Sequence, residues 1–354
     1  MTLLWFNLKV DKDDQVLAFA VDWIRQMATK MEKIVVLTME KGEYELPANV
    51  TVYSIGKERG FSECRRAFEF YRLLFRILKG EKIGAVFAHM NILFAAMAGP
   101  ILKIKRIPLF LWYAHKNVSP ILRIATLFSL KVFTSTAMGF RIPGRKVMII
   151  GQGIDTRLFR PDGETRSNDT LLCAGRISPV KNVHILVEVI DDLVRNREFG
   201  SVRLIIAGGP LDLQRDRKYL EIIKKKIRER GLGDHIVFLG KLDRDTLIKW
   251  YRRAVILLNL SDTGSLDKVL LEAMACGCIP ISSNESFRML YEQKFPRLWT
   301  TMDPSEIAYR VQAVLSLGPD DKERLRRELR EEVADGHSLK HLVDVISGYL
   351  IQGK

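Results

Sequence analysis

Two basic side chains in the second half of the chain stand where a phosphate group could bind. The stretch CAGRISPVKN, residues 173–182, predicts a strand end, a turn through Pro179 and the start of a helix, and it carries Arg176 and Lys181. A helix N-terminus offers free backbone N–H groups and the positive end of the helix dipole, so a loop that enters a helix is a ready anion site. Two exposed charges without a ligand are the alternative reading, and both readings stay open here.

A second candidate lies in TGSLDKVLLEAMACG, residues 263–277. The preceding VILLNLS predicts a strand, TGS a loop, and LDKVLLEAMAC a helix that Gly277 ends. Lys268 falls in the first turn, where the helix dipole disfavours a cation, so a bound anion would compensate its charge. Glu272 follows four residues later on the same side, and an exposed lysine and glutamate pair is the alternative. The expected core face of this helix consists of Leu266, Val269, Leu270, Ala273 and Met274.

A glycine turn follows another predicted strand. In AGGP, residues 207–210, the backbone at Gly209 can be approached closely by a ligand because glycine has no side chain. On its own this turn is a weak signal.

These loops require a scaffold of parallel strands. Short β-branched and apolar runs alternate with helical patterns along the chain, and their nearly continuous hydrophobicity is typical of parallel strands covered on both faces. We therefore predict an α/β protein with doubly wound sheets, which bind ligands beyond the carboxyl ends of their strands. The predicted strands are LLWFNL, IVVLTM, VTVYSI, AVFAHM, PLFLWY, KVFTST and VMIIGQ in the first half and TLLCAG, VRLIIAG, IVFLGK, VILLNLS and IPISSN in the second.

Length and composition favour two domains. With 354 residues the chain is long for one compact core, and GQGIDTRLFRPDGETRSNDT, which starts at residue 151, is polar and loop-like. We expect an N-terminal domain over 1–150, a linker over 151–169 and a C-terminal domain over 170–335. A closing helix over 336–354 must pack its apolar stripe on something, such as the far side of the hinge. That stripe consists of Leu339, Leu342, Val343, Ile346 and Leu350.

The net charge of +14 and the isoelectric point near 9.6 favour anionic partners: nucleic acid, phosphorylated ligands or an acidic lipid surface. No helix-turn-helix, zinc or RNA-binding aromatic signature is present, so we expect no nucleic acid. No apolar run reaches about 18 residues and the N-terminus lacks a signal-peptide pattern, so we expect a cytoplasmic protein. Four cysteines lack metal-ligand spacing and are expected to be reduced and buried; they are Cys64, Cys173, Cys276 and Cys278.

In that order, CAGRISPVKN, IIAGGP, IVFLGKLDRDTLIKWYRRA and LLEAMACGCIPISS resemble the C-terminal domain of the group 1 (family 4-like) retaining glycosyltransferases of the GT-B fold. The likeness is strong over residues 170–285, and IIGQGIDTRLFRP extends it backward. The first half matches mainly in its pattern of strands and helices. The resemblance implies two Rossmann-like domains that face a central cleft, and transfer of a sugar from a nucleotide-diphosphate donor with retention of anomeric configuration.

The resemblance also implies roles for single residues. Arg176 and Lys181 match a G-R-x-x-x-x-K pattern that holds the donor diphosphate and stabilises the leaving nucleotide. Glu272 matches a glutamate that accepts hydrogen bonds from the ribose hydroxyls. A second family glutamate, which contacts the donor sugar, would stand eight positions earlier, where this chain has Gly264.

Because the glutamate is missing, neighbouring groups would have to contact the donor sugar. Asp267 and Lys268 are the nearest side chains that could replace it. The backbone amides of Ser265 and Leu266 could still meet the phosphates or the sugar. Further donor contacts are expected at Gly209 and, beside the nucleobase, at Lys241 and Leu242.

Members of this family also carry a histidine of the N-terminal domain that faces the donor sugar. PLFLWYAHKNVSP places His115 just past a strand that begins after a proline, as in the family, and His89 at the end of AVFAHM is the alternative. A histidine that only caps a strand end is the plain reading. Many relatives have a glycine-rich loop after the first strand, whereas LKVDKDDQV has no glycine, so acceptor binding is expected to differ. Candidates there are Asn7, Asp11 and Lys12.

The stretch CRRAFEFYRLLFRILKGEK, residues 64–82, predicts a basic, aromatic, amphipathic helix. Such a helix fits an anionic membrane surface and would place the protein peripherally on the inner face of a membrane, with a lipid-linked acceptor. An ordinary sheet-covering helix with a solvated basic face is the alternative. The basic side chains are Arg65, Arg66, Arg72, Arg76 and Lys79, and the apolar ones Phe68, Tyr71, Leu74, Phe75 and Leu78.

The expected function is that of a metal-independent hexosyltransferase with no cofactor besides its nucleotide-sugar donor. In the family, basic side chains and helix dipoles stabilise the charge, and the leaving phosphate helps to deprotonate the acceptor. The acceptor is expected to be a glycan or lipid-linked precursor. Two other functions stay open: a GT-B epimerase or sugar phosphorylase, and a catalytically idle nucleotide-sugar-binding protein, which Gly264 and the missing glycine loop favour.

Overall fold

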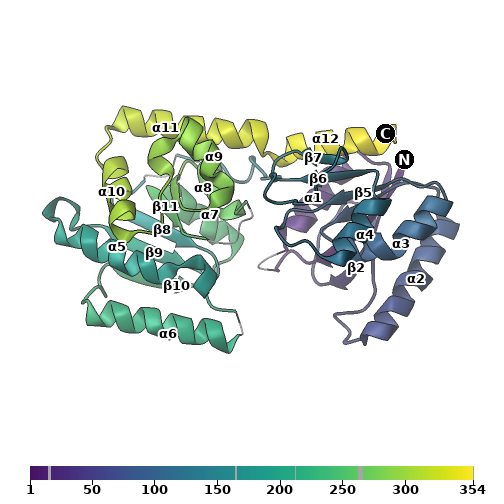
Figure 1. The fold of residues 1–354 in the computed structure, drawn as a ribbon, viewed down its shortest axis with the longest axis horizontal. Coiled ribbons are helices and arrows are strands. Elements are labelled where there is room, and N and C mark those ends of the chain that lie inside the picture. The colour runs from purple at the N-terminus through teal and green to yellow at the C-terminus, as the bar shows by residue number, and fades with distance from the viewer. Residues whose placement is uncertain (15–16, 164–165, 212, 262–265, 354) are drawn as a thin grey trace. The chain divides into compact units, whose positions relative to one another are not determined.

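The computed structural model (Figure 1) describes residues 1–14, 17–163, 166–211, 213–261 and 266–353. Contacts divide the chain into unit 1, Met1–Asp155 with His337–Lys354, and unit 2, Thr156–Gly336. The stretch expected as a linker is therefore shared between the units. Each unit is built on one parallel sheet with helices on its faces, and every run predicted as a strand forms one.

Unit 1 contains a seven-stranded sheet in the order β3-β2-β1-β4-β5-β6-β7. All its strand pairs are parallel, and β1 lies between β2 and β4. The order reverses between β1 and β4, which makes the carboxyl ends of these strands the switch point of the sheet. The strands are β1 (Thr2–Val10), β2 (Lys33–Lys41), β3 (Val50–Ser54), β4 (Ile83–His89), β5 (Leu109–Trp112), β6 (Lys131–Thr134) and β7 (Val147–Ile149).

Successive side chains of these strands point to opposite faces of the sheet and pack into two separate cores. On β1, Leu4 and Phe6 pack with the helices α2, α3 and α4, whereas Leu3 and Trp5 pack with α1 and α12 on the other face. This alternation follows from the two-residue period of a strand, and burial on both faces explains why the strands are apolar throughout. The helices are α1 (Phe19–Ala28), α2 (Glu63–Gly80), α3 (Ile92–Ile104), α4 (Pro120–Phe128) and α12 (Leu339–Gln352).

The C-terminal helix α12 belongs to unit 1. Its predicted apolar stripe is buried in the core that also contains α1, for example through Leu342 and Ile346, which are fully buried. A backbone hydrogen bond from the Leu339 N–H to the Ile154 carbonyl, 2.7 Å, fixes the start of the helix beside the end of the first stretch of unit 1.

Helix α2 has apolar side chains on more than one face, and only one of these faces packs on the core. The buried side chains are Phe70, Leu73, Leu74 and Ile77. Of the five apolar residues expected on one face, only Leu74 is buried, Leu78 is half-buried, and the three aromatic ones, Phe68, Tyr71 and Phe75, are exposed. The helix has more apolar residues than one face can hold. The buried face is mainly aliphatic and packs on the sheet, whereas the aromatic side chains are exposed.

Unit 2 contains a five-stranded sheet in the order β10-β9-β8-β11-β12, with its switch point between β8 and β11. The strands, all paired in parallel, are β8 (Thr170–Ala174), β9 (Arg203–Ala207), β10 (Ile236–Gly240), β11 (Ile256–Asn259) and β12 (Ile279–Ser282). The α-helices are α5 (Val183–Arg195), α6 (Gln214–Glu229), α7 (Arg244–Arg253), α8 (Lys268–Ala275), α9 (Glu285–Lys294), α10 (Pro304–Leu315) and α11 (Pro319–Gly336). Short 3-10 turns are η1 (Pro179–Lys181), η2 (Arg197–Phe199) and η3 (Pro296–Leu298).

Helix α8 is buried almost all round rather than along one face. Leu270, Ala273 and Met274 are fully buried as expected, but Leu271 is buried as well and Val269 is half-buried. A central position between the β11–β12 edge of the sheet and α11 accounts for this, since both contact α8. The helix is thereby fixed from several directions.

The cysteines differ in burial. Cys276 and Cys278 are fully buried, and burial raises the pKa of each thiol to about 12. Cys173 is half-buried, and burial raises the pKa of its thiol to about 11. The expectation that all four are buried is wrong for Cys64, which is exposed in the first turn of α2.

Candidate functional site

Three loops of unit 2 are joined by backbone hydrogen bonds at the carboxyl ends of β8, β9 and β10. The Gly208 N–H donates to the Gly240 carbonyl at 2.7 Å, and the Ile177 N–H donates to the Gly209 carbonyl at 2.9 Å. Gly208 has a φ of +149°, and a Cβ there would stand 1.8 Å from the Gly175 carbonyl oxygen, so only glycine fits. The loop after β8 is therefore held against Gly209.

Lys181 and Asp267 form an ion pair at the switch point of the unit 2 sheet. Lys181 Nζ donates to Asp267 Oδ2 at 2.7 Å and to Ser261 Oγ at 3.1 Å. Asn259 Nδ2, at the end of β11, donates to the same Asp267 oxygen at 3.1 Å. The two charged side chains are only 15% and 12% exposed, so solvent screens the pair weakly. An ammonium has three donors, and the described residues take two of those on Lys181.

Asn182 connects the same two loops and starts α5. It has a left-handed backbone, with a φ of +49°, and its Nδ2 donates to the Leu260 carbonyl at 3.0 Å. Helix α5 then begins at Val183, close to the expected start. The N-terminus of α5 is thus fixed beside Lys181, as an anion site requires.

Arg176 and Lys241 are exposed near this edge of the sheet. Within the described part of the chain, Arg176 makes no hydrogen bond or ion pair, which leaves its five N–H donors for water or a ligand. The Lys241 side chain lies against Gly209, where a Cβ would be 3.2 Å from Lys241 Cγ, and Leu242 is half-buried. These positions leave both basic side chains accessible from solvent.

Glu272 lies in the second turn of α8 and is half-buried. The hydroxyl of Tyr251, a fully buried residue of α7, donates to Glu272 Oε2 at 3.1 Å. Burial raises the pKa of Glu272, while the charge of Lys268 and the Tyr251 hydrogen bond offset part of the rise. The Nζ of Lys268 is shielded from solvent, so the alternative of an exposed lysine and glutamate pair is wrong.

Two of the expected donor contacts, Gly264 and Ser265, lie outside the described residues. Leu266, which follows them, is 6% exposed and packs as an apolar side chain. The structure thus describes this loop from Leu266 onward, where Asp267 already bonds to Lys181.

The two candidate histidines of unit 1 have opposite environments. His89 is 2% exposed, its Nδ1 lies 3.2 Å from Asn7 Oδ1, and its ring stacks on Trp23 at a centroid distance of 4.6 Å. His115 is exposed in the loop after β5. Its Nδ1 accepts from the Asn117 N–H at 3.1 Å, so the neutral ring carries its proton on Nε2. His89 is a core residue, whereas His115 has a ring that a ligand can reach.

The loop after β1 uses its charges internally. Lys9 Nζ lies 2.9 to 3.1 Å from oxygens of Asp11, Asp14 and Glu40. Burial alone lowers the pKa of Lys9, but the three carboxylates outweigh that effect and raise it. Lys12 pairs with Glu45 in the loop after β2, and Asn7 is 2% exposed. The three acceptor candidates are therefore engaged with neighbours.

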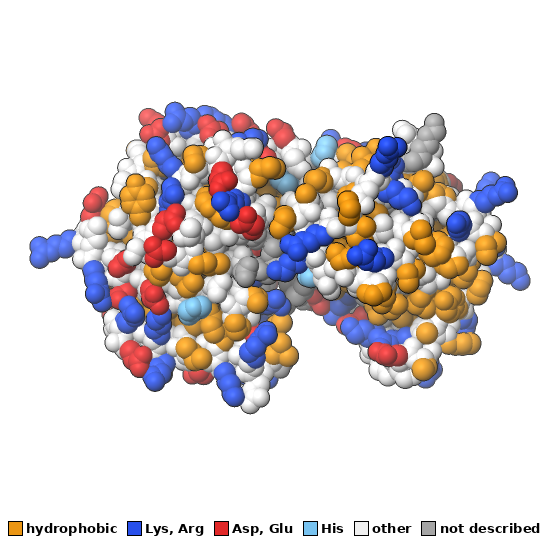
Figure 2. Space-filling model, in the orientation of Figure 1, with side chains coloured by type: hydrophobic (Ala, Val, Ile, Leu, Met, Phe, Trp, Pro, Cys, Tyr) orange, Lys and Arg blue, Asp and Glu red, His pale blue; other side chains and the backbone are white. Residues whose placement is uncertain are grey.

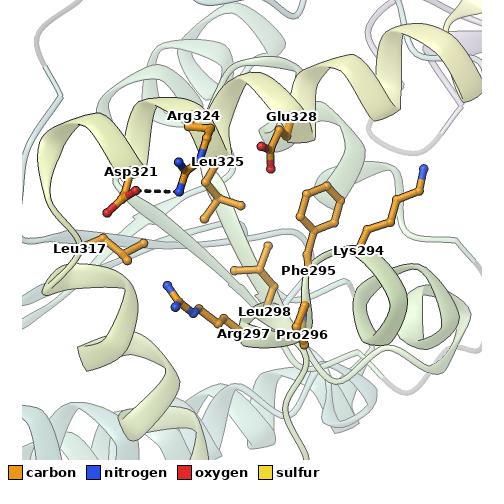
Figure 3. A pocket seen from close by; sticks show the side chains of 10 residues that line it. All are labelled: Lys294, Phe295, Pro296, Arg297, Leu298, Leu317, Asp321, Arg324, Leu325 and Glu328. Carbon is orange, nitrogen blue, oxygen red and sulfur yellow. Dashed lines mark hydrogen bonds and ion pairs between the residues drawn. The ribbon is translucent and has the colours of Figure 1, made fainter.

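A surface cavity of about 300 Å³ lies elsewhere in unit 2, where η3 and α9 face α11 (Figure 3). Its walls combine apolar groups such as Phe295 and Leu325 with charged ones, among them Arg324, which donates to Asp321 at 2.7 Å. None of the expected donor residues lines it. Among the described residues, no three histidine, cysteine or acidic side chains gather in a way that could hold a metal ion.

The family "Glycosyl transferases group 1" matches residues 155–332, half of the chain. The chain belongs to the group 1 glycosyl transferases. The matched residues include nearly all of unit 2 and every donor-site candidate except His115.

Curated group 1 relatives match over part of their length. The D-inositol 3-phosphate glycosyltransferase of Frankia alni is 30% identical over 37% of this chain and 35% of its own length. The GDP-mannose-dependent alpha-(1-6)-phosphatidylinositol monomannoside mannosyltransferase of Mycobacterium tuberculosis is 28% identical over 40% of this chain and 39% of its own length. The match thus spans little more than a third of each relative.

Solved structures show the fold of the whole chain. HepE from Anabaena, crystallised with UDP and in another crystal with UDP-glucose, superposes with a TM-score of 0.78 at 15% identity in the UDP complex. The superposition covers 99% of this chain and 100% of that one. This group 1 glycosyl transferase has the GT-B fold, with two Rossmann-like α/β units, as the sequence predicted.

In this group 1 member, the structure brings together Lys181 and Asp267 directly, and it ties Gly209 to the loop of Arg176. The sequence reasoning did not identify Tyr251 or Asn259. Asn259 had a visible signal, since it is a polar residue at the end of an otherwise apolar strand. Tyr251 had none, because it reaches Glu272 from another helix, 21 residues earlier.

Proposed function

We propose that this group 1 glycosyl transferase moves a sugar from a nucleotide-diphosphate donor to an acceptor hydroxyl, with retention of anomeric configuration. The observation that carries the proposal is the position of Lys181 at the switch point, beside the N-terminus of α5, where the described residues take two of its three ammonium donors. A diphosphate is the ligand that such a cation and helix end would bind. The UDP and UDP-glucose complexes of HepE support this assignment.

The donor would extend from Lys181 toward Glu272. Asp267 and Glu272 are five residues apart, roughly 7 to 8 Å along α8, so one rigid helix sets the spacing between the two contacts. We assign the diphosphate to Arg176 and Lys181, the ribose hydroxyls to Glu272, and the nucleobase to the loop of Lys241 and Leu242. Asp267 and Lys268 remain the proposed neighbours of the sugar in place of a glutamate at position 264.

The proposed transfer breaks the bond between C1 of the sugar and the diphosphate oxygen, and the acceptor oxygen bonds to C1 on the same face. The acceptor proton passes to an oxygen of the departing diphosphate. Arg176 and Lys181 stabilise the negative charge that develops on this group, a role that needs no metal ion. His115 is the proposed contact from unit 1, because its ring is exposed and Nε2 carries a donor.

The acceptor is proposed to be a lipid-linked or glycan precursor. The phosphatidylinositol mannoside named for the Mycobacterium tuberculosis relative supports a lipid acceptor. Such an acceptor would be met at a membrane surface, and the exposed Phe68 and Phe75 of the basic helix α2 support peripheral association there. Among the described helices, none is long and apolar enough to cross a membrane.

Thermal unfolding with UDP, GDP, ADP and their sugars tests the donor assignment. We expect one nucleotide series to raise the melting temperature, and Lys181→Ala to abolish that rise. An acceptor screen with the selected donor would follow, with the anomeric configuration of the product read by NMR and the metal requirement read by adding EDTA. Product of inverted configuration, or activity lost in EDTA and restored by a divalent cation, would contradict the corresponding part of the proposal.

The same experiment distinguishes sugar transfer from a second candidate function. The glycine at position 264 favours a protein that binds a nucleotide sugar without transferring it. A donor that stabilises the protein, with no nucleotide release across the acceptor panel, would support that function and contradict transfer.

A further inference from the structure

Large apolar side chains are exposed on three helices that cover one face of the unit 1 sheet. The helices α2, α3 and α4 pack into one core cluster. Their outward sides expose Phe68 and Phe75 on α2, Ile104 at the end of α3, and Ile124 and Leu127 on α4, with Ile104 83% and Leu127 71% exposed. Contiguous exposed apolar area of this kind marks an interaction surface.

The three helices form one continuous layer. The rings of Phe70 on α2 and Phe94 on α3 are 4.5 Å apart. A Cβ on Gly99 of α3 would stand 2.5 Å from the Phe128 ring of α4, so this glycine allows the two helices to pack closely. In the view of Figure 2, hydrophobic side chains gather over α3 and α4, with Lys and Arg among them.

The charge of this layer has one sign over most of its length. Between Glu81 and Asp155 the sequence contains no aspartate or glutamate but ten lysine and arginine residues. This tract includes all of α3 and α4. Helix α2 has two glutamates and five basic residues, and one of the glutamates, Glu69, is bonded to Arg72 at 2.6 Å. The acidic residues of unit 1 are concentrated in its first half, so the layer presents positive charge to a partner.

Helix α4 has buried apolar residues on one side and exposed apolar residues on the other. Leu122 and Ala125 are fully buried, while Ile121, Ile124 and Leu127 recur every three residues on the opposite side. Arg123 is exposed between them. At the end of α3, the exposed Ile104 is flanked on both sides by exposed basic residues, Lys103, Lys105 and Arg106.

We propose that the outer face of α2, α3 and α4 docks on an anionic lipid bilayer. The apolar side chains of α4 and of the α3 end would enter the interface, and the flanking cations would bind the headgroups. The inference widens the contact from α2 to the whole layer. It rests on the proposed function only for the idea that a lipid acceptor is met there. A second copy of the chain is disfavoured as the occupant, because it would bring the same positive charge to the contact.

Flotation with vesicles tests the proposal in the absence of donor and acceptor, so its outcome is independent of the proposed transfer. We expect binding to vesicles of equal parts phosphatidylcholine and phosphatidylglycerol, and at least about tenfold weaker binding to pure phosphatidylcholine. Ile124→Ser combined with Leu127→Ser should weaken binding at least about tenfold. The matched control is Ile222→Ser on α6 of unit 2, where the isoleucine is 61% exposed. The melting temperature reports whether the α4 variant is folded. If it is not, Ile104→Ser is the second variant.

The charge contribution is tested by Lys103→Gln combined with Lys105→Gln, against Lys218→Gln combined with Lys225→Gln on α6. Only the first pair should weaken binding, and high salt should remove the difference between them. Equal binding to neutral and anionic vesicles would overturn the proposal, as would binding that the α4 variant leaves unchanged. A dimer in solution that the α4 variant dissociates would assign the face to a second copy and overturn it as well.

Discussion

At the carboxyl edge of the unit 2 sheet, charged side chains from two loops bond to each other, whereas at the edge of the unit 1 sheet the polar side chains of β1 and β4 bond within the core. In unit 2, Lys181 reaches Asp267 across the switch point. In unit 1, the equivalent switch point holds Asn7 and His89, both 2% exposed. His115, one strand away, is the exposed group.

We interpret this difference as a division between two tasks of a glycosyl transferase, donor binding and acceptor binding. We expect the diphosphate of the donor to bind Lys181, whose ammonium is already held in place by Asp267 and Ser261 beside the N-terminus of α5. At the unit 1 edge, Asp11 and Asp14 of the loop after β1 are paired with Lys9. We expect such an edge to bind an acceptor by shape or through His115, without a dense set of charges.

The largest effect is expected at the unit 2 edge. Lys181→Ala should lower kcat/KM about a hundredfold to a thousandfold, because the leaving diphosphate loses a charge-assisted hydrogen bond in the transition state. Steady-state kinetics with the identified donor measures it. Lys224→Ala on α6, a partly exposed lysine that pairs with Glu221, is the matched control and should leave the rate unchanged. A loss below tenfold for Lys181→Ala would show that the diphosphate binds elsewhere.

Substitution of the two histidines of unit 1 should affect different properties, activity for His115 and stability for His89. His115→Ala is expected to lower kcat about tenfold or more with an unchanged melting temperature, since the ring is exposed and acts only on bound ligand. His89→Ala should cost about 2 to 4 kcal/mol of folding free energy, because it empties a site lined by Trp5, Trp23 and Phe87. Kinetics and denaturant unfolding of both variants measure the contrast. Reversed effects would assign the catalytic histidine to position 89.

Glu272→Gln should raise the donor KM about tenfold without lowering stability at neutral pH. Glutamine keeps an oxygen for the Tyr251 hydroxyl but lacks the charge that we propose binds the ribose hydroxyls. Because burial raises the pKa of Glu272, the folded state holds that proton more tightly than the unfolded state. The wild-type stability therefore falls as pH rises from about 4.5 through the folded-state pKa.

The variant should accordingly melt at a higher temperature than the wild type at pH above that window, and the gain should shrink at acidic pH. Melting curves across the pH range test the sign. Glu292→Gln on the exposed side of α9 is the control and should show no gain. A variant that is less stable at neutral pH would indicate that Glu272 is held as a charge for structural reasons.

The sequence predicted the scaffold well because its signals were local. Each strand was an apolar run of its own, and every one formed. The residues around Lys181 were found because a loop that enters a helix N-terminus is visible in the sequence. What it could not predict were contacts between elements, such as the ion pair of Lys181 with Asp267, 86 residues apart, and the hydroxyl of Tyr251 on Glu272.

The exposed face of unit 1 could be predicted only in part, for a related reason. An amphipathic pattern reports that a helix has an apolar side, but α2 has two, and the packing of Phe70, Leu73 and Ile77 on the sheet decided which of them stayed outside. The exposed apolar residues of α4 recur every three residues, but buried apolar residues stand directly beside them in ILRIATLF, so the sequence does not show which set stays outside.

The cysteines allow the two units to be compared without a change in the proposed site, because a thiol reagent should modify them at different rates. A thiol reagent at pH 8 should modify Cys64 of unit 1 at once, because it is exposed. Cys276 and Cys278 of unit 2 should react only as that unit opens, since both are fully buried and a pKa of about 12 leaves almost no thiolate. In a Cys64→Ser background, labelling of Cys276 and Cys278, distinguished by mass spectrometry from labelling of the half-buried Cys173, therefore reports the opening of unit 2.

The donor nucleotide should slow that labelling, because it binds the folded state of unit 2 and not the open one. At a hundred times its dissociation constant, opening should become about a hundredfold rarer. Labelling of Cys64 in the wild type is the internal control and should keep its rate, as α2 lies outside the proposed donor site. Protection of Cys64 instead of Cys276 and Cys278 would move the nucleotide site to unit 1 and reverse the division of tasks between the two sheets.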